Sequence, residues 1–330
     1  MKKFNKILSL SLIMFIMLGM CSACTFLDSF RGSDNQSSEI DVLELQPSLV
    51  PMAQVPAVSF ILSPVASGNR VEKNSKVQID YSNTADGYIM VKWLSQTTRQ
   101  LRVLVTGPTD VTYTYTIWPN DTFEVFPLSD GNGSYTAKVY EQTDSGKYAQ
   151  AGSLKFSVTL KDEFAPFLRP NQFVDFNEKS KVVVKASELV AGKTGLTDKI
   201  AAVYSFVTSY LSYDTDFANE VIGGGHKGYF PDLEEVYQRR KGVCFDYASM
   251  MTAMLRSQSI PTKLVIGYAG DIKHAWINVY SKETGWIDKV IFFDGKSWLL
   301  MDPTFASSSN SAATRAFIGD GANYTEMNLY

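Results

Sequence analysis

The sequence predicts an α+β protein in which an antiparallel β-sandwich precedes a domain of helices followed by strands. Two observations lead to this fold class. Between residues 55 and 165, apolar and polar residues alternate in several short runs that are separated by turn sequences. From residue 170 onward the apolar residues first recur at helical spacing, and strand-like runs follow later in the same segment. Helices first and strands afterwards favour an α+β domain.

The composition is that of a soluble globular chain. The 330 residues are 45% hydrophobic and 20% charged, and the net charge is -3. This length accommodates two ordinary domains. A protein whose main partner is nucleic acid usually carries a basic face, so the charge argues against nucleic acid as a partner. The net charge does not distinguish an enzyme from a binding protein.

The N-terminal residues predict export. The stretch MKKFNK carries three lysines, residues 7–20 are uncharged, and small residues follow. This is the pattern of a signal peptide, and the apolar run is short for a transmembrane helix, which needs about 20 residues. An uncleaved anchor helix is the alternative interpretation.

The motif Ser22-Ala23-Cys24 indicates the cleavage point, because it resembles the bacterial lipobox. In that motif the cysteine is lipidated and becomes the new N-terminus, although Cys21 stands where an aliphatic residue is usual. We therefore expect residues 1–23 to be a lipoprotein signal peptide. Lipidated Cys24 would anchor the chain at the extracytoplasmic face of the cell membrane.

Two segments are expected between the anchor and the helical region. Residues 24–54 lack a sustained period, and their section RGSDNQSSE is polar and small, which is typical of a flexible tether. Residues 55–165 predict the sandwich, and the run NGSYTAKVYE resembles a late strand of an immunoglobulin-like or fibronectin-like domain. Because this region shows no catalytic constellation, we expect it to be a spacer or a partner-binding domain.

Residues 170–330 predict the second domain. The run TDKIAAVYSFVTSYL indicates a helix with Thr197 as its N-cap. Residues 212–230 are glycine-rich and are expected to be irregular. A short helix is expected next, with Pro231 early and basic residues late. The runs TKLVIGYAG, HAWINVYS and SWLLMD predict strands.

Cys244 is the only cysteine beyond the first 24 residues. Gly242 permits a tight turn before it, and Ala248, Met251 and Leu255 follow at helical spacing. Cys244 is therefore expected at or near a helix N-terminus, where free backbone N–H groups and the helix dipole favour a thiolate. Taken alone, a cysteine packed in the core is the simpler interpretation.

Two further residues complete a possible catalytic set. The chain has two histidines, and His274 begins the run HAWINVY, while Asp302 ends the run SWLLMDP. Considered singly, His274 reads as a surface residue and Asp302 as a turn residue. A nucleophile at a helix start, followed by a base and an orienting carboxylate on later strands, is the arrangement that covalent acyl transfer needs.

Three stretches together resemble the transglutaminase-like superfamily: RRKGVCFDYASMMTAMLRSQSIPTKLVIGY, HAWINVY and WLLMDPTF. The resemblance covers about residues 170–310. It implies a papain-like transglutaminase core, in which a helix carrying the cysteine packs on an antiparallel sheet. It also implies that Cys244 is the nucleophile, His274 the base and Asp302 the orienting acid.

The backbone N–H of Cys244 is the natural first donor to the oxyanion that forms when the thiolate attacks a carbonyl, and the resemblance also suggests a second donor. The family often adds an aromatic donor from upstream, and LSYD is similar to that segment, so Tyr213 is a candidate. A core aromatic is the alternative interpretation of Tyr213. Gln238 is a second candidate donor, and His226 is expected on a surface loop. The sequence shows neither metal-ligand spacing nor a phosphate-binding loop, so we expect no cofactor.

The resemblance implies an enzyme that forms a thioester with protein or peptide amides, including those of the cell wall. An amine acceptor would make it a transglutaminase, and water would make it an amide hydrolase. A first alternative is a non-catalytic surface module that binds or scaffolds while keeping the fold. A second is an adhesion or wall-scaffolding role of the sandwich, with a regulatory second domain.

Overall fold

The computed structural model describes residues 61–330, apart from residues 223–224, 227, 289–290, 294–297 and 301–323. Residues 54–330 make up one structural unit. The predicted signal peptide and tether lie outside the described residues, as do Cys24 and Asp302. Within the described part of the chain, no helix is long and apolar enough to cross a bilayer.

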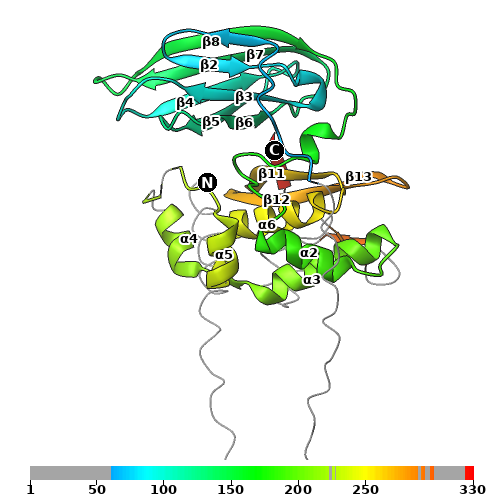
Figure 1. Cartoon of the computed structure of the whole chain (residues 1–330). Coiled ribbons are helices and arrows are strands. Elements are labelled where there is room, and N and C mark those ends of the chain that lie inside the picture. Colours follow the sequence, from blue (N-terminus) through cyan, green and yellow to red (C-terminus); the bar gives the residue numbers. More distant parts are fainter. Residues whose placement is uncertain (1–60, 223–224, 227, 289–290, 294–297, 301–323) are drawn as a thin grey trace, which may run out of the picture. The chain divides into compact units, whose positions relative to one another are not determined.

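The N-terminal part of this unit consists of two antiparallel four-stranded sheets (Figure 1). The first sheet has the order β1 (Val71–Lys73), β2 (Val77–Asp80), β3 (Tyr88–Trp93) and β6 (Glu124–Pro127). The second has the order β5 (Thr112–Ile117), β4 (Leu101–Thr106), β7 (Gly133–Gln142) and β8 (Tyr148–Val158). Strand β7 lies between β4 and β8, as strand F lies between C and G in immunoglobulin-like sandwiches.

The predicted alternation explains why these strands form a sandwich. In β5, Tyr113, Tyr115 and Ile117 are buried, whereas Thr112 and Thr114 are exposed. Side chains of a strand point alternately to opposite faces, so each such strand presents one apolar face to the other sheet. The turn after η1 (Thr84–Asp86) needs Gly87, because its φ is 85° and a Cβ there would lie 2.7 Å from Pro166.

The second part of the unit contains five helices and a four-stranded antiparallel sheet among the described residues. The helices are α2 (Lys181–Val190), α3 (Leu196–Tyr210), α4 (Thr215–Ile222), α5 (Leu233–Arg239) and α6 (Cys244–Arg256). The sheet has the order β13 (Gly285–Ile287), β12 (Ile272–Ser281), β11 (Thr262–Ala269) and β16 (Tyr324–Leu329). This part also contains two separate two-stranded sheets, formed by β9 (Ser212–Tyr213) with β10 (Lys241–Gly242) and by β14 (Ile291–Phe293) with β15 (Trp298–Leu300).

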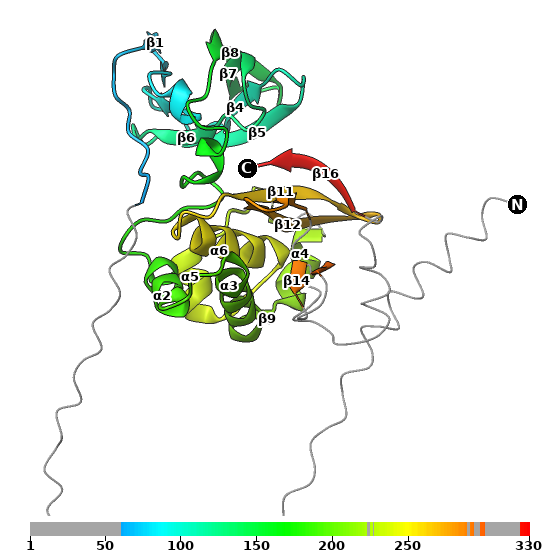
Figure 2. The ribbon, with the colours of Figure 1, turned by 90° about the vertical axis from the view of Figure 1, so that its right-hand side faces the viewer.

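Helix α6 is the centre of this part. It packs on β11 and β12 on one side and on α2, α3 and α5 on the other (Figure 2). A helix enclosed in this way is largely apolar, and its buried polar groups need partners. The side chains of Tyr247, Met250 and Met251 are fully buried. The expected helix on an antiparallel sheet is therefore confirmed.

The last residue of α6 fixes its C-terminal end. The buried Arg256 guanidinium donates to the carbonyl oxygens of Thr262 at 2.9 Å, Arg169 at 2.7 Å and Tyr330 at 2.6 Å. Burial lowers the pKa of Arg256 to about 9, so the side chain stays charged at neutral pH. It thereby joins the helix to β11, to the residue that follows β16 and to the segment that follows the sandwich.

Three local predictions about the helices were wrong. Residues 215–222 form α4, although the stretch from 212 to 230 was expected to be irregular. Helix α3 begins at Leu196 with Gly195 at the N-cap, so Thr197 is inside it. Helix α5 begins two residues after Pro231, because the Asp232 carboxylate caps the N–H groups of Glu234 and Glu235 at 3.0 Å each.

Candidate active site

Cys244 is the first residue of α6, as the sequence predicts. Val243 precedes it with extended backbone, and the N–H groups of Asp246 and Tyr247 close the first turn on the Val243 carbonyl at 2.9 and 3.2 Å. The Cys244 side chain is half-buried and is not in a disulfide. The first N–H groups of a helix have no partner within that helix. The Cys244 N–H therefore stands at the positive end of α6, beside its own thiol.

A short parallel pairing brings Tyr213 close to this turn. Strands β9 and β10 align Tyr213 with Gly242, and the Gly242 carbonyl accepts from the Asp214 N–H at 2.9 Å. Gly242 lies two residues before Cys244, so Tyr213 is held next to the chain that leads to the thiol. Tyr213 and Cys244 both pack at the margin of the main apolar core. This placement supports Tyr213 as a candidate without fixing where its hydroxyl acts.

His274 lies inside a strand and not at its start. It is the third residue of β12, opposite Gly267 of β11, and only 7% of it is exposed. Its ring lies 6.4 Å from the rings of Trp276 and Tyr324. The alternative interpretation of His274 as a surface residue is therefore wrong. Because α6 packs directly on β12, the two predicted catalytic residues lie on elements in contact.

Asp302 lies outside the described residues. The strand expected to carry it is present as β15, which ends at Leu300. Strand β15 pairs with β14 and not with the sheet that contains His274. The predicted role of Asp302 stays a prediction.

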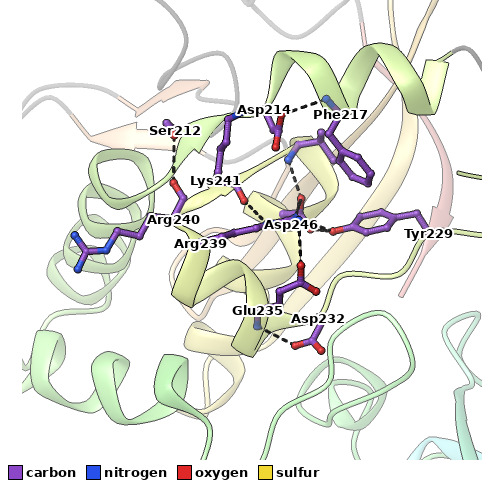
Figure 3. A network of polar contacts seen from close by, with 11 residues as sticks. Ser212, Asp214, Phe217, Tyr229, Asp232, Glu235, Arg239, Arg240, Lys241 and Asp246 are labelled. Carbon is purple, nitrogen blue, oxygen red and sulfur yellow. Dashed lines mark hydrogen bonds and ion pairs between the residues drawn. The ribbon is translucent and has the colours of Figure 1, made fainter. Parts of the chain in front are cut away.

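A polar network surrounds the first turn of α6 and was not foreseen from the sequence (Figure 3). Its centre is Asp246, whose carboxylate is fully buried. Tyr229 donates to Asp246 Oδ1 at 2.5 Å, and the Val243 N–H donates to Oδ2 at 2.8 Å. The Arg239 guanidinium reaches Oδ2 at 3.4 Å. A second pair, Lys241 with Asp214 at 3.0 Å, flanks this network.

The two carboxylates of this region are shifted in opposite directions. Burial raises the pKa of Asp246, although the Tyr229 and Val243 hydrogen bonds and the Arg239 charge counteract the shift. Burial also acts to raise the pKa of Asp214, but the hydrogen bond and charge of Lys241 outweigh it, so that pKa is lowered. Burial raises the pKa of the Tyr229 hydroxyl, which therefore keeps its proton and donates it.

The comparison with protein families decides the identity of this part of the chain. Residues 185–303 match the model of the Transglutaminase-like superfamily. These residues form a transglutaminase-like domain. The predicted nucleophile, base and acid all lie within the matched range.

One curated relative of the transglutaminase-like domain is the uncharacterized protein YebA of Bacillus subtilis, 27% identical over 126 residues. The match covers 32% of this chain and 17% of YebA, so the chain spans about a sixth of that relative. A proposed cysteine protease from Cytophaga hutchinsonii aligns with 71% of this chain and 72% of its own, at 16% identity and a TM-score of 0.36. The periplasmic domain of TgpA from Pseudomonas aeruginosa aligns with 72% and 75%, at 14% identity and a TM-score of 0.32.

The remaining two residues that the sequence offered as site candidates are on the surface of the transglutaminase-like domain. Gln238 is exposed on α5. His226 is an exposed residue between α4 and α5, and its Nε2 lies 2.7 Å from Glu220 Oε2. Among the described residues, no cluster of three or more histidine, cysteine, aspartate or glutamate side chains is arranged to hold a metal ion.

Sequence reasoning missed Asp246, Tyr229 and Arg239. One signal was present, because an acidic residue in the first turn of an otherwise apolar helix needs a partner when it is buried. Its partners come from α5 and from the loop before α5, and no local pattern links those segments to α6.

Proposed function

We propose that this chain is a thiol acyl-transfer enzyme that acts on protein or peptide amides, including those of the cell wall. The observation that carries the proposal is the position of Cys244 at the N-terminus of α6 within a transglutaminase-like domain. Helix α6 packs on β12, the strand that bears His274. A half-buried thiol at a helix start is accessible to a substrate carbonyl, and the unpaired N–H groups of the first turn lie beside it.

The proposed first step forms a thioester. The Cys244 thiolate attacks the amide carbonyl carbon, and a C–S bond forms as the carbonyl oxygen becomes an oxyanion. The Cys244 N–H and the Tyr213 hydroxyl are the proposed oxyanion donors. Protonated His274 gives its proton to the leaving nitrogen, the C–N bond breaks and the amine departs.

The second step returns the thiolate. His274 takes a proton from an amine or a water molecule as that nucleophile attacks the thioester carbonyl. The C–S bond then breaks, and the product is a new amide or a carboxylic acid. Asp302 is proposed to orient the His274 ring, following the resemblance of the DPT motif. A binding module that keeps the fold would carry out neither step.

The reactivity of Cys244 tests the proposed nucleophile directly. Iodoacetamide should alkylate Cys244 of the folded full chain at pH 6–7 faster than in the urea-unfolded chain, because the helix N-terminus and His274 favour the thiolate. Site-resolved mass spectrometry of the Cys244 peptide separates this thiol from Cys21 and Cys24. His274→Ala should reduce the alkylation rate, and His226→Ala is the matched control. A folded chain whose Cys244 reacts no faster than the unfolded one would support the core-cysteine interpretation.

We also propose that the mature chain is a lipoprotein at the extracytoplasmic face of the cell membrane. The proposal rests on Ser22-Ala23-Cys24 after the uncharged run. Mass spectrometry of the membrane fraction should find an N-terminal, acylated Cys24 and no peptide from residues 1–23. Cys24→Ser should release the chain from the membrane fraction, because a diacyl anchor accounts for stable attachment. A mature chain that begins elsewhere without lipid would exclude this anchor.

A further inference from the structure

Burying the Asp246 carboxylate in α6 costs free energy, because the charged group loses its hydration. It is fully buried at the third position of α6, and burial raises its pKa. A buried carboxylate is tolerated only when hydrogen bonds and an opposite charge compensate for its lost hydration. Asp246 receives that compensation from Tyr229, Arg239 and the Val243 N–H.

The partners of Asp246 all belong to the chain that leads into Cys244. The Val243 N–H belongs to the residue immediately before the thiol. Arg239 is the last residue of α5, and its Nε also donates to the Lys241 carbonyl at 2.8 Å. Arg240, between Arg239 and Lys241, adopts a φ of 54°. This left-handed conformation costs conformational free energy for a residue other than glycine. The Arg239–Lys241 bond spans that residue and holds the turn from α5 into β10.

Gly242 completes this arrangement. A Cβ on Gly242 would lie 2.7 Å from Asp246 Cβ and 2.8 Å from Oδ2. Asp246 therefore packs directly against the backbone of β10, the strand that aligns with Tyr213. One carboxylate thus fixes the end of α5, strand β10 and the N-cap of α6.

We propose that Asp246, held by Tyr229 and Arg239, is a positioning residue for the Cys244 thiol and its backbone N–H. This inference rests on the proposed function, since it concerns the same nucleophile. Asp246 accepts the Val243 N–H and so sets the direction in which the chain enters the helix, while the Cys244 N–H remains available for the oxyanion. Arg239 balances the Asp246 charge and so holds the buried carboxylate in place beside the first turn of α6.

The test is the pH profile of Cys244 alkylation by iodoacetamide in the full chain, followed by mass spectrometry of the Cys244 peptide. Asp246→Ala should lower the rate at pH 7 by about tenfold, because the first turn of α6 then loses the acceptor of the Val243 N–H and no longer directs its free N–H groups at the thiol. Asp246→Asn keeps an acceptor for the Val243 N–H and should hold the rate within about threefold of wild type. Tyr229→Phe removes one hydrogen bond and should give an intermediate loss.

Tyr135→Phe is the matched control, because it removes a phenol that donates to the Gly131 carbonyl at 2.9 Å inside the sandwich. It should lower the thermal stability without changing the Cys244 profile. If Asp246→Ala or Tyr229→Phe stays folded and keeps the wild-type profile, the network is purely structural and the inference is wrong. If Asp246→Ala does not fold, the Cys244 alkylation profile of Tyr229→Phe alone decides whether the inference stands.

The same experiment separates this inference from the proposed function. A wild-type Cys244 that reacts no faster than in the unfolded chain would overturn both. A reactive wild-type thiol with an unchanged profile in the Asp246 and Tyr229 variants would overturn the positioning role alone. A reactive wild-type thiol with a reduced rate in Asp246→Ala, restored by Asp246→Asn, supports both.

Discussion

Replacing Cys244 with alanine is expected to lower kcat/KM for amide turnover by at least about 10³-fold, because the covalent route through the thioester is lost. The assay supplies a peptide library and a fluorescent primary amine, and it measures both amine incorporation and release of the free acid. Either product from the wild-type chain counts as turnover. Cys244→Ala should form neither.

The double variant Cys244→Ala/His274→Ala gives the sharper result. Residues that act as one catalytic unit are not additive, so the double variant should be little worse than Cys244→Ala alone. Cys21→Ser is the matched control, because it removes a thiol in the predicted signal peptide. Full turnover by Cys244→Ala would refute the mechanism. A wild-type chain that turns over no amide but binds a wall or protein ligand as well as Cys244→Ala would indicate the binding module.

Gly267→Ala should cause the largest loss of stability among the strand glycines, about 3 kcal/mol. A Cβ on Gly267 would lie 2.1 Å from the Thr325 carbonyl oxygen and 2.5 Å from the Trp276 ring. Backbone cannot yield as a flexible side chain does, so β16 must move away from β11. The register between these strands already shifts between Ile266 and Gly267. Urea unfolding followed by circular dichroism measures the change.

The variant also reports on the candidate site, because Gly267 is the cross-strand partner of His274. A displaced β11 should disturb His274 and slow Cys244 alkylation. Gly152→Ala is the matched control, since its Cβ would make an ordinary contact of 3.4 Å with Val77 in the sandwich. It should change the free energy of unfolding by less than about 1 kcal/mol. If the two variants lose equal free energy of unfolding, the close approach at Gly267 is relieved by a shift that does not lower stability, and the prediction is wrong.

Local patterns in the sequence were enough to predict much of the fold. Alternation predicted which side chains of β5 are buried, and helical spacing after Gly242 placed Cys244 at the start of α6. These predictions succeed because side-chain direction repeats every two residues in a strand and about every 3.6 in a helix. The period is therefore readable without knowing what the element packs against. The resemblance to transglutaminase-like proteins added the roles of His274 and Asp302, which periodicity alone does not give.

Helix α4 shows where local reading fails. The glycines of residues 223–225 suggested that the whole stretch was irregular, but the preceding residues 215–222 form a helix. Glycine lowers helix stability only where it stands, and it says little about the turn before it. Thr197 failed for a related reason, since a good capping residue within the first turn does not by itself set where a helix begins.

By itself, the sequence determined that this chain carries a single thiol beyond its first 24 residues, at a helix start, with a histidine in a strand-forming run and a sandwich before them. Only the tertiary structure decided that His274 is buried opposite Gly267, that Tyr213 aligns with Gly242, and that Asp246 is shared by Tyr229 and Arg239. Each of these depends on how separate elements pair and pack, and not on the period within one element. Forming these contacts costs the entropy of closing the loops between the elements, and packing around α6 offsets that cost. No local period in the sequence encodes this packing.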